Sequence, residues 1–144
     1  MKPVIYLRIA SVLTLLHAIL HTIGGVFSTP DPGPQQTAVD AMKANTFPLM
    51  GSIRSYFAFF RGMGLGVTIF LVALAVLLWQ LSSFAKAGSF RLTPLYWTLV
   101  VAFVAMALNS YLYFFWPPVI VELLIAVCLV EAIITSKPAL PRET

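Results

Sequence analysis

The chain has 144 residues, of which 60% are hydrophobic and 10% are charged, and its formal net charge is +4 at pH 7. A water-soluble domain carries about a quarter charged residues, so this chain has too little polar surface to cover a water-soluble core. Its few scattered basic residues do not indicate nucleic-acid binding, and its length is typical of one domain. Its one cysteine, Cys128, cannot form an internal disulfide. The composition therefore predicts an integral membrane protein.

Four segments of the chain are long and apolar enough to cross a bilayer as helices, which takes about 20 mostly apolar residues. They run over about 4–27, 55–81, 93–115 and 119–135. So few residues separate the third segment from the fourth that these two must form a tight hairpin. No segment shows the alternating pattern of a membrane β-barrel. The predicted fold class is all-α, a four-transmembrane-helix bundle that forms a single membrane domain over residues 1–144.

The polar stretch between the first two segments, residues 28–54, is the outer loop of this predicted topology. It starts with the turn-rich "PDPGP" and continues with "QQTAVDAMKANTF". In the latter, Ala38, Val39 and Met42 share one side of a helix, so we expect a short amphipathic helix. Such a helix rests at the membrane interface as a surface element, or covers the outer mouth of the bundle as a lid.

The basic residues predict the orientation of the chain. Cytoplasmic loops of membrane proteins carry an excess of lysine and arginine. With both termini in the cytoplasm, six basic residues lie inside, and we therefore expect a multi-pass membrane protein in this orientation. The first segment is too long for a cleaved signal peptide, and no clear cleavage site follows it. The six basic residues are Lys2, Arg8, Lys86, Arg91, Lys137 and Arg142.

One face of the first segment is polar and carries both histidines of the chain. At 100° per residue, the polar and small residues of this segment fall within one stripe about 120° wide. With the amino terminus inside, both histidines lie in the outer half of the bilayer. The stripe contains Ser11, Thr14, His17, His21, Gly25 and Ser28.

Three further polar residues fall at the same depth on the other segments. Arg61 lies about two turns from the outer end of the second segment, Asn109 near the outer end of the third, and Glu122 about one turn into the fourth. An arginine at such depth is costly when it faces lipid. Gly62 and Gly66 form a G-x-x-x-G pattern, which predicts close packing against another helix.

Together these residues predict an outward-facing polar pocket, because intramembrane ionisable residues are candidates for function. Its expected ligand-binding residues are His17, His21, Arg61, Asn109 and Glu122. Two histidines at i and i+4 also suit a metal with Glu122 as a third ligand. The H-E-x-x-H form is absent, however, and Arg61 would repel a cation, so we expect no metal.

Three functions are open at this point. The first is binding of a lipid-like hydrophobic small molecule in the pocket. The second is a membrane enzyme, an isomerase or reductase of a lipid, that uses histidine and glutamate for acid–base chemistry with no catalytic residue yet assigned. The third is an accessory structural subunit of a larger membrane complex. The expected partners are membrane lipids, with a homo-oligomer or a larger complex left open, and the sequence assigns no cofactor.

The sequence resembles an uncharacterised family of small bacterial four-span integral membrane proteins. The resemblance covers most of the chain and rests on "YLRIASVLTLLHAILHTIGG", the "PDPGP" loop, "MKANTFPLMGSIRSY" and the F-x-x-G-x-G-L run from Phe59 to Leu65. It implies a four-span protein of the bacterial inner membrane and no particular activity. More loosely, the architecture is similar to sterol-isomerase-like and DoxX-type four-helix membrane proteins. That similarity implies a helical bundle that binds or isomerises lipids.

Overall fold

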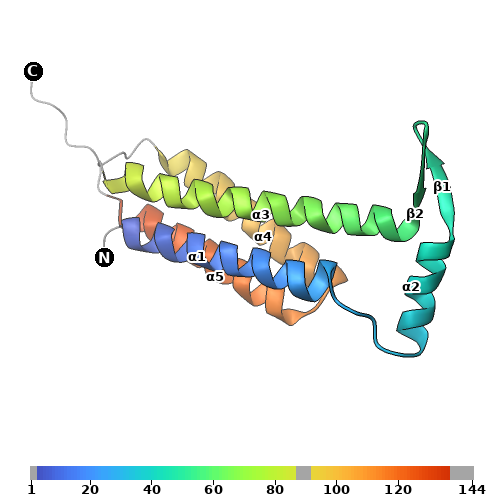
Figure 1. The fold of residues 1–144 in the computed structure, drawn as a ribbon. Coiled ribbons are helices and arrows are strands. Elements are labelled where there is room, and N and C mark those ends of the chain that lie inside the picture. The colour runs from blue at the N-terminus through green and yellow to red at the C-terminus, as the bar shows by residue number, and fades with distance from the viewer. Residues whose placement is uncertain (1–2, 87–91, 137–144) are drawn as a thin grey trace, which may run out of the picture. The chain divides into compact units, whose positions relative to one another are not determined.

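The computed structural model describes residues 3–86 and 92–136. This part of the chain is almost entirely helical, with a small β-hairpin between the second and third α-helices (Figure 1). The elements in chain order are α1 (Pro3–His21), the π-helix η1 (Thr22–Val26), α2 (Pro34–Ala44), β1 (Thr46–Leu49), β2 (Ser52–Ser55), α3 (Tyr56–Lys86), α4 (Thr93–Tyr113) and α5 (Trp116–Ile134).

Four helical segments of the described residues are long and apolar enough to cross a membrane: Pro3–Val26, Tyr56–Ala85, Thr93–Tyr113 and Trp116–Thr135. The predicted all-α fold with four membrane helices is therefore confirmed, and the chain is a multi-pass membrane protein. The fourth helix begins at Trp116, earlier than predicted. Pro117 and Pro118 fit into its first turn. Proline has no backbone N–H group, and the N–H groups of the first turn have no partner within the helix in any case.

Helices α4 and α5 form the tight hairpin that the sequence predicted. Only Phe114 and Phe115 separate the two helices, which lie side by side along their length (Figure 1). Phe115 has an extended backbone conformation, which lets the chain reverse direction before α5 begins.

The structure divides into two compact units. Among the described residues, the first unit comprises residues 3–17, 71–86 and 92–136, and the second comprises residues 18–70. The expectation of a single membrane domain over 1–144 stays a prediction. So does the orientation of the chain, since Lys2, Arg91, Lys137 and Arg142 lie outside the described residues.

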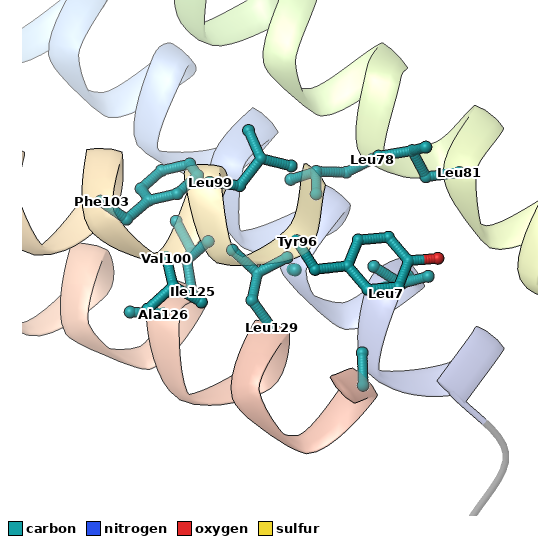
Figure 2. Packing of buried hydrophobic residues seen from close by; sticks show 12 residues of the cluster. Leu7, Leu78, Leu81, Tyr96, Leu99, Val100, Phe103, Ile125, Ala126 and Leu129 are labelled. Atoms are coloured by element: carbon teal, nitrogen blue, oxygen red, sulfur yellow. The ribbon is translucent and has the colours of Figure 1, made fainter. Parts of the chain in front are cut away.

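The core of the first unit is a layer of leucine, alanine and aromatic side chains contributed by four helices (Figure 2). A hydrogen bond of 2.7 Å from Ser11 Oγ to the carbonyl oxygen of Ala75 also links α1 to α3. Interhelical bonds of this kind join membrane helices, between which lipid provides no hydrophobic driving force. The core residues are Leu7, Ala10, Leu78, Leu81, Tyr96, Leu99, Val100, Phe103, Ile125, Ala126, Leu129 and Ala132.

The second unit contains the predicted amphipathic helix as α2, which ends at Ala44. The residues that follow form an antiparallel hairpin that the sequence analysis did not predict, in which Thr46 pairs with Ser55 and Leu49 with Ser52. Met50 and Gly51 make the turn, and both have positive φ angles, 45° and 82°. Two such residues give the turn a twist that matches paired strands.

Candidate ligand-binding site

Three polar side chains from three helices meet inside the first unit. The carboxylate Oε1 of Glu122 on α5 lies 3.9 Å from Nε2 of His17 on α1. The same oxygen accepts a hydrogen bond of 3.1 Å from Oγ of Ser110 on α4. All three residues are buried, and Glu122 is only 2% exposed. We call His17, Ser110 and Glu122 the carboxylate cluster.

The hairpin explains how Ser110 and Glu122 come together. Ser110 lies in the last turn of α4, and Glu122 lies in the second turn of α5. Residues at similar distances from a tight turn face each other across an antiparallel helix pair. The sequence analysis missed Ser110. The signal that could have found it is the short connection between the helices, which places the last turn of α4 opposite the second turn of α5.

The second carboxylate oxygen of Glu122 has no hydrogen-bond partner among residues 3–86 and 92–136, although it is fully buried. A buried polar atom left without a partner costs about 1–3 kcal/mol, and more when it is charged. Most buried polar side-chain atoms in folded proteins are paired, and exceptions often have a functional reason. The carboxylate cluster therefore offers one unused acceptor inside an apolar bundle.

A shallow aromatic depression lies at the turn between α4 and α5. It has a volume of about 260 Å³ and is lined by Tyr111, Phe114, Phe115, Trp116 and Val119. The rings of Tyr111 and Trp116 meet edge to face, with centroids 5.6 Å apart. Val119 precedes Glu122 by about one turn of α5, so the two residues lie on the same face of that helix. The depression thus begins one helical turn from the carboxylate cluster.

His21 belongs to the second unit and makes a different contact. Its Nε2 donates a hydrogen bond of 3.1 Å to the carbonyl oxygen of Gly64 on α3. A second contact between the same two segments lies nearby, where the hydroxyl oxygens of Thr22 and Thr68 are 2.9 Å apart. These bonds join the carboxyl end of the first membrane segment to α3, and a ligand-binding role of His21 stays a prediction.

Gly62 and Gly66 pack against no other helix of the described residues, so their close packing against a partner helix stays a prediction. Open space surrounds the position of a Cβ atom at both residues. Gly64 instead provides the close approach, because a Cβ atom there would lie 2.9 Å from Cγ2 of Val26. Val26 ends the π-helix η1, in which the wider turn is closed by a bond of 3.0 Å from the backbone N–H of Phe27 to the carbonyl oxygen of Thr22.

Arg61 also belongs to the second unit and lies between two aromatic rings. Its Cζ atom is 4.8 Å from the ring centroid of Phe57 and 5.3 Å from that of Phe27. Its Nε atom is buried and has no hydrogen-bond partner in the described part of the chain.

The structure thus brings two of the five predicted ligand-binding residues, His17 and Glu122, into one cluster. Asn109 is exposed, and its neighbour Ser110 makes the contact inside the bundle. His21 and Arg61 lie in the other unit, so a pocket that contains all five residues stays a prediction. None of the five lines the aromatic depression.

The described residues contain no group of three or more histidine, cysteine, aspartate or glutamate side chains that could hold a metal ion. The carboxylate cluster supplies two such side chains and a hydroxyl group. A carboxylate, an imidazole and a hydroxyl group are able to form hydrogen bonds, and the first two are also able to exchange a proton.

Comparison with known proteins adds no family to these observations. No protein-family model, no curated protein and no solved structure matches the chain. The resemblance to small four-span membrane proteins is supported only by the four apolar helices.

Proposed function

We propose that the protein binds a lipid-like hydrophobic small molecule with a polar head that donates a hydrogen bond, such as a hydroxyl group. The head would bind Glu122, and the apolar body would lie in the aromatic depression. The observation that carries this proposal is the buried Oε2 atom of Glu122, which has no hydrogen-bond partner among the described residues.

The energetics of burial favour such a ligand. A carboxylate inside a membrane helix bundle is costly, and such residues face the interior and mark sites of function. Ser110 and His17 both approach Oε1, which leaves Oε2 as the acceptor for a donor group. A hydrogen bond to a charged group contributes about 1.5–3 kcal/mol, which would offset the cost of burial at this atom.

The size of the depression restricts how the ligand is bound. Ligand pockets usually measure about 300–1,000 Å³, so a depression of about 260 Å³ holds one end of a lipid-like molecule. The rest of the molecule would lie along the apolar outer surface of the helices. Aromatic side chains at this end of the hairpin are also typical of the membrane interface, where amphipathic molecules are found.

The proposal includes the orientation expected from the sequence. With both termini in the cytoplasm of a bacterial cell, the turn between α4 and α5 would face the outer side of the inner membrane. The depression and the carboxylate cluster would then open outward.

A second candidate is an enzyme that isomerises or reduces a lipid by acid–base catalysis. The observation that favours it is the distance of 3.9 Å between Nε2 of His17 and Oε1 of Glu122. A histidine and a carboxyl group at this separation can exchange a proton with a bound ligand. Turnover of the bound molecule would distinguish this candidate from a binding protein.

The proposal is tested by a native mass spectrum of the protein released from mild detergent. We expect an adduct of lipid-like mass on the wild-type chain and its loss from the Glu122→Gln variant. Glu131→Gln is the matched control, since Glu131 lies on the same helix and outside the carboxylate cluster. A bare wild-type chain that remains folded would contradict the proposal and favour the structural-subunit function instead.

A further inference from the structure

We infer that Arg61 forms a separate binding site in the second unit, for the phosphate group of an anionic phospholipid. The site goes beyond the proposed function, because it consists of other residues. Its ligand is an anion that accepts hydrogen bonds, whereas the ligand of Glu122 donates one. The site consists of the guanidinium group of Arg61, the rings of Phe27 and Phe57, and the ammonium group of Lys43 on α2.

The contacts of the Arg61 guanidinium group within the described residues are with two aromatic rings. Phe57 and Phe27 both lie next to Cζ of Arg61, at 4.8 and 5.3 Å. A cation–π contact is an electrostatic attraction to the ring and supplies no oxygen or nitrogen acceptor to the N–H groups. An arginine with its N–H donors unused binds two oxygens of a phosphate group side by side.

The buried Nε atom shows that a donor is unused. Nε of Arg61 is inaccessible to water and has no acceptor among residues 3–86 and 92–136. A buried donor without an acceptor carries a desolvation cost. A phosphate group that displaces the side chains now covering Nε would place one oxygen on Nε and a second on the neighbouring Nη atom.

The local charge also favours an anion. Asp31 and Asp40 are the acidic residues of the second unit. Asp40 lies 3.7 Å from Lys43, and no carboxylate of the described residues lies within ion-pair distance of Arg61. Nζ of Lys43 is in turn 5.2 Å from the centroid of Phe57, so two cationic groups approach one ring. The single carboxylate near them leaves one positive charge uncompensated.

The position on the helix indicates a lipid rather than a soluble phosphate. Arg61 is five residues into α3, or roughly 7.5 Å from its start at 1.5 Å per residue. The large apolar residues around it, Phe59, Phe60 and Met63, are exposed on the same stretch of helix. A phospholipid could place its phosphate on Arg61 and its acyl chains on these side chains, which a soluble phosphate could not use.

The test is retention of phospholipid by the full chain, measured by native mass spectrometry after incubation with phosphatidylglycerol or phosphatidylcholine. We expect the wild-type chain to retain more phosphatidylglycerol than phosphatidylcholine. In Arg61→Gln, the amount of retained phosphatidylglycerol should fall at least tenfold. Arg61→Lys should give an intermediate value, because lysine keeps the charge without the paired donors. Arg54→Gln is the matched control, since Arg54 is exposed on β2 and donates to its own strand.

Three results would overturn the inference. The first is equal retention by wild type, Arg61→Lys and Arg61→Gln. The second is equal retention of the two phospholipids by wild type. The third is displacement of phosphatidylglycerol by glycerol phosphate at the same concentration, which would assign the site to a soluble phosphate. Retention that falls in Arg61→Gln and not in Glu122→Gln assigns the phospholipid to this site. Retention that falls in Glu122→Gln and not in Arg61→Gln would also overturn the inference and assign the phospholipid to the carboxylate cluster of the proposed function.

Discussion

The close contact between Gly64 and Val26 gives a quantitative prediction for Gly64→Ala. The added methyl group would lie 2.9 Å from Cγ2 of Val26, so the side chain of Val26 or one of the two segments must shift. Overpacking of this kind costs about 1–3 kcal/mol. Alanine is favoured over glycine inside a helix by up to about 1 kcal/mol, which offsets part of the cost. We expect Gly64→Ala to destabilise the protein by about 0–2 kcal/mol.

Gly62→Ala is the matched control, because it makes the same chemical change two residues away in open space. It should stabilise the protein by about 0.5–1 kcal/mol. The difference between the two variants removes the helix-propensity contribution and leaves the overpacking cost. Thermal unfolding in detergent, followed by tryptophan fluorescence, measures both variants, and Val26→Ala should restore the stability lost in Gly64→Ala. Equal shifts for Gly64→Ala and Gly62→Ala would show that Val26 does not approach Gly64 in the folded protein.

Two further predictions concern polar atoms of the first unit, and the same unfolding measurement checks both. Ser110→Ala removes the hydrogen bond to Glu122 and should cost about 1–3 kcal/mol, whereas Asn109→Ala, at an exposed position, should change stability by less than about 0.5 kcal/mol. Equal effects would contradict the contact with Ser110. Tyr96→Phe should leave stability unchanged or raise it, since the buried hydroxyl of Tyr96 has no partner in the described residues. A loss above about 1 kcal/mol would show that this hydroxyl is paired.

Much of the fold follows from the length of the apolar segments. Each predicted span corresponds to a helix because about 20 apolar residues suffice to cross a bilayer. The tight hairpin followed from the short connection between the third and fourth spans. The β-hairpin did not, because each strand has only four residues and β1 contains Pro48. The turn residues Met50 and Gly51 also lack the Asn-Gly or Asp-Gly pattern that marks such hairpins.

The candidate site was predictable where a helix has one polar face. Ser11, Thr14 and His17 are buried as the stripe on the first span predicts. The third span carries polar and apolar residues around its axis and therefore has no clear interior face. Lipid is as apolar as the core, so hydrophobicity does not separate Ser110 from Asn109. Gly64, rather than Gly62 or Gly66, approaches Val26 because of how η1 and α3 are aligned along their lengths. A pattern of small residues in one segment does not specify that alignment.

The central claim is that Glu122 accepts a hydrogen bond from the head of a lipid-like ligand. Its most direct test is the ratio of affinities for a long-chain alcohol and for the methyl ether of that alcohol, measured by equilibrium dialysis in detergent. The two ligands differ in the hydroxyl donor. We expect wild type to prefer the alcohol by about 10–100-fold, as a hydrogen bond to a charged group implies. The preference should fall in Glu122→Gln and persist in Glu131→Gln. Equal affinities of wild type for the alcohol and the ether would contradict the claim.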